Sequence, residues 1–551
     1  MIYDLILKNG FIIDGTGNPG FYGDIAIKDN LIAKIDSKIN SNTNKEIDCC
    51  GKVITPGFID PHVHEEIVAI LDGKFEKFLK QGVTTTINGN CGHSITPYSS
   101  ENVYEYMYKN GLLLEEEKKY LIDKNKCWNN FTEYCDLISK SGISVNMGFL
   151  LGHGTIRWSV MGGSKDRPPT EKEKNEITDI INDGMKSGAF GISTGLAYIP
   201  SKYADIDELV DIARQIKEYD GIYTSHIRDY IGRYNAVKEA IEVGQKSGAR
   251  VQVSHLSPVE IEAFDEILKA RYNGVEIMVD TVPRSSGHCM KKKRVIQFIM
   301  AISSSLFELG IDGVMDALRN EEGRTLILKE AFILGDRGSI ILLNTKDINM
   351  EKKSIREIAT QKGIDEDKLL LDLLLDGDEE LIFCLGGMYR ADFPDKLHDD
   401  KIIDNPFVMV GSDCLFSVGG DMSWFELQRR GAFPIFFNMY RKSGVRLEEI
   451  VRRVTSLPAR QFKIKNRGIL KEGLIADIAV IDMDNYSYPR SEDIDFSKPQ
   501  LLANGVEYVI VNGKIALENG EITENKCCLL YTSTIPRNKR QHRMPLSPCT
   551  T

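Results

Sequence analysis

The chain has 551 residues, of which 69 are Lys or Arg and 80 are Asp or Glu, so its formal net charge is −11. With 42% hydrophobic residues it can bury a large core, which excludes a disordered or fibrous protein. The acidic balance argues against nucleic acid or an anionic membrane as the main partner, since both favour Lys and Arg. We therefore expect a globular protein that acts on a small molecule.

The beginning of the chain does not resemble an export signal, because Asp4 and Lys8 interrupt the apolar stretch that such a signal needs. A later apolar stretch, residues 295–311, contains Gln297 and Glu308 and is too polar to cross a bilayer. The 11 cysteines have no paired spacing. These features predict a soluble cytoplasmic protein with reduced thiols and no membrane partner, and they indicate no oligomeric state.

Residues 2–54 alternate apolar and polar side chains between Asn-Gly and Asp-Asn turns, which predicts short strands. The same pattern returns at residues 477–522. We expect the two segments to pair as one small β-sandwich, assigned to residues 1–55 and 465–525.

Between these segments, eight short β-branched runs end in polar residues, and a helix-like stretch follows each run. The runs are residues 57–64, 83–92, 143–154, 189–196, 221–228, 250–257, 275–283 and 407–414. This alternation predicts an α/β fold, a (β/α)8 TIM-like barrel over residues 56–464. The gap between Pro283 and Phe407 is too long for one unit, so we expect an inserted subdomain near residues 288–352.

The last 26 residues differ from the rest of the chain. Residues 526–551 contain five Lys or Arg and no Asp or Glu, which leaves a net charge of −16 on residues 1–525. They show neither helical nor strand periodicity and resemble translated vector sequence. We expect a non-native or disordered tail; the alternative is a genuine basic tail that binds an acidic partner.

Six potential metal ligands lie at predicted strand ends. Two of them, His62 and His64, are two residues apart on one strand, so both rings point to one face. Each of the six taken alone could be a core or capping residue. Because the carboxyl ends of barrel strands share one rim, their joint occurrence favours a catalytic zinc site. The six residues are His62, His64, Cys91, His226, His255 and Asp413.

These residues belong to longer motifs that extend over most of the chain, from about residue 2 to about residue 523. The motifs are GFIDPHVH, GVTTTINGNCG, GHGTIRWSVMG, GAFGISTGLAYIP, YTSHIRDY, VSHLSP, VGSD, RRVTSLPA and NRGILKEGLIADIAVID. Together they resemble the amidohydrolase superfamily and, more narrowly, the N-acyl-D-amino-acid deacylases, or D-aminoacylases. The resemblance implies a (β/α)8 barrel, a β-sandwich built from both chain ends and an insertion after the seventh strand.

The resemblance also implies how the ligands divide between two metal positions. Many relatives bridge two metals with a modified lysine on the fourth strand, but GAFGISTGLAY has no lysine, and the deacylase branch uses a cysteine in GNCG instead. Cys91, His226 and His255 would then hold one tight zinc ion. His62, His64 and Asp413 would face a second position that is weaker or optional.

The implied reaction is hydrolysis of an amide. Bound zinc can activate water at neutral pH and polarise the acyl carbonyl. Asp413 would accept the proton of the water and deliver it to the leaving amine, because an amide nitrogen departs only when it is protonated.

The substrate-binding pattern departs from the family. Arg284 stands where relatives usually have Tyr, and Glu426 and Gln428 stand where a His-Pro-Arg is expected. A guanidinium in a shifted position could still bind a substrate carboxylate in two-point fashion. The candidates are Arg284, Arg429 and Arg430, with Ser286 or His288 assisting, and the alternative is that these arginines are solvated or paired on the surface.

The leading hypothesis is therefore zinc-dependent hydrolysis of N-acyl-D-amino acids or related N-acyl amino acids. A cyclic-amide hydrolase resembling dihydroorotases or hydantoinases is the second hypothesis, and the missing lysine counts against it. A non-catalytic scaffold is the third, although such proteins usually lose metal ligands that this chain retains. The acyl group, the side chain and the stereochemistry of the substrate do not follow from the sequence.

Overall fold

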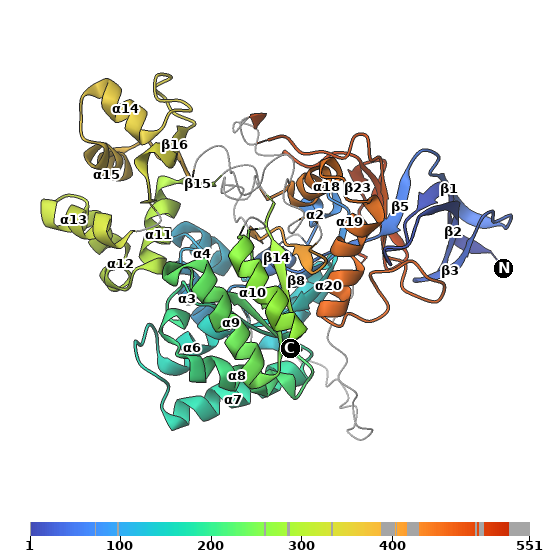
Figure 1. The fold of residues 1–551 in the computed structure, drawn as a ribbon, viewed down its shortest axis with the longest axis horizontal. Helices are drawn as coiled ribbons and strands as arrows, with labels where there is room; N and C mark the ends of the chain where they lie inside the picture. The colour runs from blue at the N-terminus through green and yellow to red at the C-terminus, as the bar shows by residue number, and fades with distance from the viewer. Residues whose placement is uncertain are drawn as a thin grey trace.

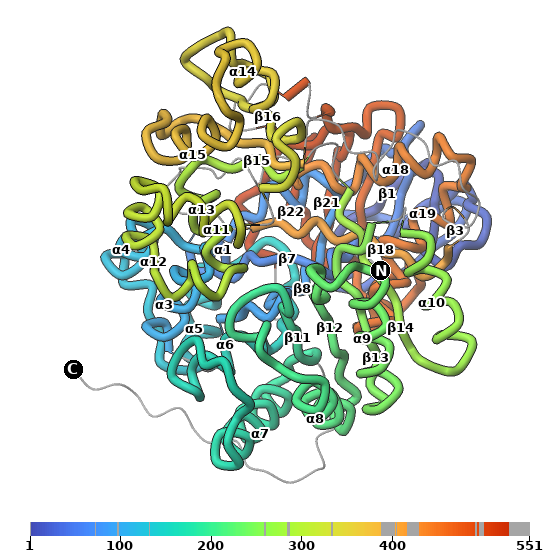
Figure 2. The backbone as a smooth tube through the Cα atoms, turned by 60° about the vertical axis from the view of Figure 1, so that its left-hand side comes forward, coloured from blue at the N-terminus to red at the C-terminus, as the bar shows by residue number. Residues whose placement is uncertain are grey.

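The computed structural model describes residues 2–71, 73–95, 99–257, 260–283, 287–331, 334–386, 403, 405–415, 429–490, 493–494 and 501–527. Two parts are distinct in Figure 1: a barrel with surrounding helices, and a sheet that contains both the first strands and the last strands of the chain. A smaller inserted unit stands apart from both, at the upper left of Figure 1 and at the top of Figure 2.

The two chain ends form one nine-stranded sheet. Its strands, in the order of their pairing, are β23 (Glu521–Ile522), β22 (Lys514–Glu518), β21 (Val506–Val511), β20 (Ile478–Ile481), β5 (Val53–Pro56), β1 (Tyr3–Ile12), β2 (Phe21–Lys28) and β3 (Leu31–Asp36), with β4 (Thr43–Asp48) beside β1. Antiparallel pairing of β20 with β5 places Val480 opposite Ile54 and joins the two ends. The two chain ends therefore pair with each other, as the sequence predicts, while the bounds assigned to a β-sandwich stay a prediction.

Eight parallel strand positions make the barrel, and all eight predicted runs supply one. The strands are β6 (Phe58–Asp60) with β7 (Val63–His64), β8 (Val83–Asn88), β9 (Asn146–Phe149) with β10 (Leu151–Gly152), β11 (Gly191–Gly195), β12 (Ile222–His226), β13 (Arg250–Val253), β14 (Ile277–Thr281) and β18 (Val408–Val410). A short parallel pair between β7 and β19 (Cys414–Leu415) links the last strand position to the first. The (β/α)8 prediction is confirmed.

Helices cover the outside of the barrel. They are α1 (Glu66–Leu71), α2 (Glu76–Leu79), α3 (Ser100–Lys109), α4 (Glu115–Asp123), α5 (Phe131–Ser141), α6 (His153–Met161), α7 (Glu171–Lys186), α8 (Ile206–Lys217), α9 (Arg233–Ser247), α10 (Ile261–Tyr272), α18 (Ala432–Lys442), α19 (Leu447–Val454) and α20 (Ser456–Gln461), with 3-10 turns η1 (Ser201–Tyr203) and η2 (Asp229–Ile231). The local sequence defines where several of these helices begin. For example, the Asp205 side chain caps α8 by accepting from the Glu208 backbone amide at 2.8 Å.

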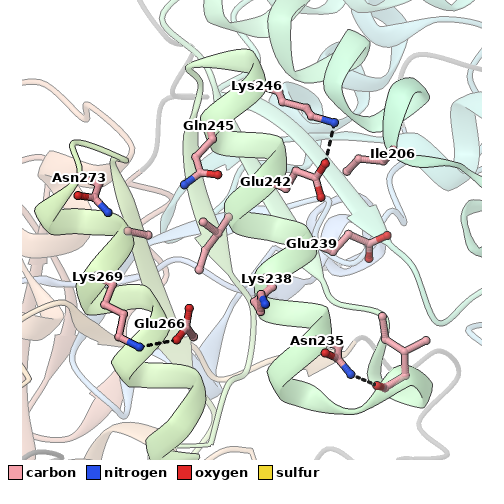
Figure 3. A pocket seen from close by; sticks show the side chains of 13 residues that line it. Ile206, Asn235, Lys238, Glu239, Glu242, Gln245, Lys246, Glu266, Lys269 and Asn273 are labelled. Atoms are coloured by element: carbon pink, nitrogen blue, oxygen red, sulfur yellow. Dashed lines mark hydrogen bonds and ion pairs between the residues drawn. The ribbon is translucent and has the colours of Figure 1, made fainter.

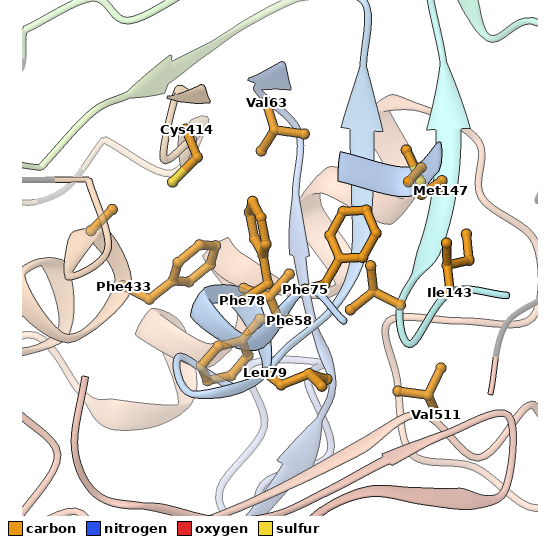
Figure 4. Close-up of a cluster of buried hydrophobic side chains, with 14 of the residues drawn as sticks. Phe58, Val63, Phe75, Phe78, Leu79, Ile143, Met147, Cys414, Phe433 and Val511 are labelled. Atoms are coloured by element: carbon orange, nitrogen blue, oxygen red, sulfur yellow. The ribbon is translucent and has the colours of Figure 1, made fainter. Parts of the chain in front are cut away.

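A buried aromatic cluster packs beneath the strand that leads to the predicted histidines. The Phe58 ring stacks on Phe433 and Phe437 of α18, with centroid distances of 5.6 and 5.3 Å. Phe78 of α2 and Val511 of the nine-stranded sheet belong to the same cluster (Figure 4). Because interiors pack as densely as organic crystals, these contacts fix the position of β6 relative to the sheet.

The inserted unit is a three-stranded antiparallel sheet with helices. It contains β15 (His288–Lys291), β16 (Ile340–Leu343), β17 (Ile382–Leu385), α11 (Lys292–Ile302), α12 (Ser304–Ala317), α13 (Glu321–Glu330), the 3-10 turn η4 (Arg337–Ser339), α14 (Ile355–Lys362) and α15 (Glu366–Asp376). It therefore extends beyond the predicted range of 288–352, because its central strand is β17. Arg294 joins it to the barrel by an ion pair of 2.5 Å with Glu117.

A buried polar network connects the barrel to the nine-stranded sheet. Asp477 accepts from the Asn146 amide at 2.9 Å and from the Asn512 backbone at 2.7 Å. Asn512 also donates to the carbonyl of Cys527 at 3.0 Å. Lys526 and Cys527, which open the predicted tail, thus lie against the folded body, whereas residues 528–551 are outside the described residues. Within the described part of the chain, no helix has the length and apolarity needed to cross a membrane.

Candidate metal centre

Two groups of three metal-binding side chains lie at the carboxyl ends of the barrel strands and share His62. The first group is His62, Cys91 and His255, and the second is His62, His64 and Asp413. Within each group the ligand atoms lie within 4.8 Å of one another. The Cys91 Sγ is 3.3 Å from His62 Nε2 and 3.6 Å from His255 Nε2. The structure therefore brings these predicted residues together at the rim where barrel enzymes act.

His226 lies beside the first group. Its Nδ1 is 2.8 Å from His255 Nε2, and its Nε2 is 3.6 Å from a carboxylate oxygen of Asp229. The sequence-based hypothesis combined Cys91 with His226 and His255, whereas the three mutually close donors include His62 instead of His226. The difference arises because His226 is turned toward the ring of His255. Which rings hold the ion stays a prediction.

Three of the site residues adopt left-handed backbone conformations. The φ angles are 52° at Cys91, 40° at His255 and 54° at Asp413. Hydrogen bonds from neighbouring chain segments fix these turns: the Asp413 amide donates to the His62 carbonyl at 2.8 Å. Such conformations are unfavourable for residues with a Cβ and cluster at functional sites.

Gly195, in the STGL motif of β11, allows the Cys91 loop to approach the barrel closely. A Cβ atom at position 195 would lie 2.0 Å from the Cys91 carbonyl oxygen, a distance at which backbone atoms must move. Glycine, which has no Cβ, permits this close approach.

The electrostatic surroundings favour the thiolate form of Cys91. Burial alone would raise the pKa of the thiol, but His62, His226 and His255 outweigh burial and hold it well below its ordinary value. Burial likewise opposes the charged form of His64, yet Asp413 and Cys91 raise its pKa to about 9. The thiolate is the form of cysteine that binds metals.

A buried carboxylate that the sequence analysis missed orients two of the ligands. Asp280, on β14, accepts from the His62 Nδ1 at 3.1 Å and from the His255 backbone at 2.9 Å. Its other oxygen accepts from the Gln252 amide at 2.8 Å. Since a carboxylate only accepts, Nδ1 of His62 carries a proton, and this hydrogen bond orients the ring with Nε2 toward Cys91. The sequence did contain a signal for a functional carboxylate here, because Asp280 is the one charged residue near the end of the largely apolar run VEIMVDTVP.

The donor chemistry of the first group fits zinc. A thiolate together with imidazole nitrogens is the ligand set that zinc prefers over harder cations such as magnesium or calcium. The proton held on His62 Nδ1 by Asp280 leaves the other ring nitrogen available, as in many metal-binding histidines.

Asp413 is paired with a guanidinium. Its Oδ2 lies 2.7 Å from Arg429 Nη2, and its Oδ1 lies 3.3 Å from His64 Nε2 and 3.7 Å from His62 Nε2. Burial would raise the pKa of this carboxyl, but Arg429 and His64 outweigh burial and hold it below its ordinary value. The arginine that the sequence offered to a substrate carboxylate is thus engaged by a carboxylate of the protein.

The rings of Tyr198 and His93 flank the centre, and the sequence analysis assigned a role to neither. The Tyr198 ring lies 4.7 Å from the His226 ring and 4.9 Å from the His93 ring. His93 is neutral, because burial lowers its pKa to about 3, and its Nδ1 lies 2.7 Å from the Tyr106 hydroxyl. Tyr198 belongs to the GLAYIP motif, which was the available signal.

Of the predicted substrate-binding residues that the structure describes, Arg429 lies at the centre and His288 lies in the inserted unit. His288 begins β15 in the inserted unit, where it pairs with Leu385 and packs against Phe298 with ring centroids 6.2 Å apart. Arg284 and Ser286 lie outside the described residues, as do Glu426 and Gln428. Their roles stay predictions.

A hollow of about 750 Å³ lies on the outer surface, between α9 and α10 (Figure 3). Four of its charged side chains form two ion pairs: Lys246 pairs with Glu242 at 2.6 Å, and Lys269 pairs with Glu266 at 2.7 Å. None of the residues that line it is a histidine or a cysteine. The candidate catalytic chemistry therefore lies at the metal centre.

The chain resembles curated proteins along almost its whole length. It is 28% identical over 518 residues to a D-aminoacylase of Alcaligenes xylosoxydans xylosoxydans, covering 93% of this chain and 94% of that protein. It is 26% identical over 521 residues to an N-acyl-D-glutamate deacylase of the same organism, covering 93% of each chain.

Solved structures establish the same fold. A D-aminoacylase structure with a binuclear metal centre superposes with a TM-score of 0.69 at 23% identity, covering 95% of this chain and 98% of that one. The N-acyl-D-glutamate deacylase of Bordetella bronchiseptica, complexed with zinc and a phosphonate inhibitor, superposes with a TM-score of 0.69 at 24% identity, covering 96% and 100%. The model of the amidohydrolase family matches residues 45–290 and 408–517, more than half of the chain. The chain therefore belongs to the amidohydrolase family.

Proposed function

We propose that this protein hydrolyses the amide bond of N-acyl-D-amino acids, or of related N-acyl amino acids, to a carboxylate and a free amino acid. The observation that carries the proposal is the group of Cys91, His62 and His255 at the barrel rim, next to Asp413, in a chain that resembles a D-aminoacylase over 93% of its length. This combination of donors and neighbouring carboxylate suits metal-assisted hydrolysis.

Cys91, His255 and either His62 or His226 would hold one zinc ion, and His62, His64 and Asp413 would face a second, weaker position. When bound, zinc supplies a Lewis acid that makes water more acidic and polarises the acyl carbonyl. The protein's own part is to keep the cysteine ionised and to fix the ring orientations, which Asp280 does for His62.

Asp413 is the proposed general base and acid. It is ionised at neutral pH, since Arg429 and His64 lower its pKa, so it can accept a proton from the attacking water. Once protonated it is a strong acid for the same reason and passes the proton to the leaving nitrogen. That transfer is required because an amide nitrogen departs only when it is protonated.

Recognition of the substrate carboxylate is the less constrained part of the proposal. Arg284 and Ser286, which follow the seventh barrel strand in the sequence, are the proposed contacts, with His288 assisting. The proposed partner is a small N-acyl amino acid, and the proposed compartment is the cytoplasm, as expected from the sequence.

The proposal is tested with a panel of N-acetyl D- and L-amino acids, scored for released amine, on wild-type protein and on Asp413→Asn. We expect turnover of D-configured substrates by the wild type and a loss of at least about 100-fold in kcat for the variant, the lower end of what general acid–base catalysis contributes. Zinc content should stay near the wild-type value, because the first group is left intact.

Asp482→Asn is the matched control, since this carboxylate pairs with Lys52 at 2.8 Å in the nine-stranded sheet. It should turn over substrate like the wild type. Normal hydrolysis by Asp413→Asn would contradict the role of Asp413, and an inactive wild type with full zinc content would contradict the substrate class.

A further inference from the structure

The second group of candidate ligands already contains a cation. The Arg429 guanidinium donates through Nη2 to Asp413 Oδ2 at 2.7 Å and through Nη1 to the main-chain carbonyl of Asp413. The Arg429 side chain is only 2% exposed. Two attachment points to one residue hold the guanidinium in place, and burial shields the pair from solvent ions.

The pair changes what the second group can offer to a metal. Of His62, His64 and Asp413, only the carboxylate brings a negative charge, and Arg429 neutralises that charge. A guanidinium stays protonated at any pH compatible with folding, so its charge is permanent. A divalent ion at Asp413 would have to share the carboxylate with this cation in a buried setting, where like charges repel strongly.

The first group differs in this respect. Its negative charge is the Cys91 thiolate, which is surrounded by imidazole rings whose protons a metal can displace. The charge of Arg429 cannot be displaced in that way. The two groups therefore differ in their capacity for a divalent ion even though they share His62.

We propose that Arg429 serves as the resident cation of the second group and is the reason why His62, His64 and Asp413 hold an ion more weakly than the Cys91 group does. The inference rests on the proposed metal centre. It assigns Arg429 a role in setting metal stoichiometry in place of the substrate contact predicted from the sequence.

The test measures zinc per chain directly. Zinc-free full-length protein is dialysed to equilibrium against increasing zinc sulfate, and bound zinc is determined by elemental analysis. The wild type should bind one tight equivalent. Arg429→Gln, which removes the charge, should bind a second equivalent with a dissociation constant at least tenfold lower than that of the wild type's second equivalent.

Two further variants separate the local charge effect from general damage. In Arg453→Gln a different arginine is changed, one that is also 2% exposed and pairs with Glu449 at 2.9 Å; this variant should keep the wild-type stoichiometry. The double variant Arg429→Gln with Asp413→Asn should return to one equivalent, because the gained ion needs the freed carboxylate. Arg429→Met, uncharged and similar in length, replaces Arg429→Gln if the latter does not fold.

Two tight equivalents in the wild type would overturn the inference, as would an unchanged second dissociation constant in both uncharged variants. Failure of the metal centre itself gives a different result: a wild-type chain that binds no zinc contradicts the proposed function as well. A gain of zinc in Arg453→Gln equal to that in Arg429→Gln would also overturn it.

Discussion

Replacement of Asp280 by Asn separates the charge of this residue from its hydrogen bonds. The Asn oxygen can keep accepting from His62 Nδ1 and the His255 backbone, which lie 3.1 and 2.9 Å from Asp280 Oδ1. The new amide group can face Gln252, whose buried Oε1 has no hydrogen-bond partner in the described part of the chain and can turn to accept it. We therefore expect the zinc-free protein to change in stability by no more than about 1 kcal/mol.

Zinc affinity should fall much more than stability does. A carboxylate behind a ligating histidine raises the basicity of the ring, and loss of such a partner typically weakens metal binding about 10- to 100-fold. That loss corresponds to about 1.4 to 2.7 kcal/mol of binding free energy. The dissociation constant is measured by competition with a chromophoric chelator, and the urea unfolding midpoint of the zinc-free protein is measured alongside it.

Asp60→Asn is the matched control, because Asp60 is also a buried carboxyl next to His62 but contacts its backbone amide and not its ring nitrogen. Asp60 accepts from the backbone amides of His62 and Ser412, both at 3.1 Å, and burial raises its pKa to about 7. Its neutral form is thus already accessible, and it does not contact the ring. If Asp280→Asn binds zinc within twofold of the wild type while its fold is intact, the carboxylate of Asp280 does not support the ligand and the reasoning is wrong.

Two further predictions concern the tight metal and acid stability. Cys91→Ala should lose the tight zinc, which elemental analysis of the purified variant measures; undiminished zinc would remove Cys91 from the ligand set. Glu208 accepts from His153 Nε2 at 2.9 Å and from Arg157 Nε at 3.0 Å, and these partners lower its pKa despite burial. The stability that Glu208 contributes is therefore fully present above its ordinary pKa of 4.5. It is lost as the pH falls through the lower pKa of the folded state. Glu208→Ala should therefore unfold at lower urea than the wild type at pH 7, by about 3 kcal/mol of unfolding free energy, and the difference should shrink below pH 4.5; an equal difference at both pH values would contradict this account.

The barrel could be predicted because its strands are encoded locally. Each run of β-branched residues is buried on both faces in a parallel sheet, so a continuous apolar segment marks it without knowledge of its neighbours. The extent of the insertion could not be predicted in this way. Its central strand β17 pairs Cys384 with Cys289, two residues almost a hundred positions apart, and such pairing leaves no local pattern.

The candidate site, too, could be predicted in part from the sequence. Strand ends placed His62, Cys91 and His255 at one rim, and that much follows from topology. Which rings share an ion depends on side-chain rotation, which placed His226 against His255. The pairing of Arg429 with Asp413 depends on the path of the chain between them, which sequence periodicity does not describe.

The left-handed turns at Cys91, His255 and Asp413 have a consequence for how the chain can change. Each such turn in a residue with a Cβ costs on the order of 1 kcal/mol. Glycine would relieve much of that cost at every one of the three positions, but it would remove the reactive side chain. Selection for thermal stability alone would therefore favour replacement of these three residues by glycine. Engineering that raises the stability of the protein should leave them unchanged.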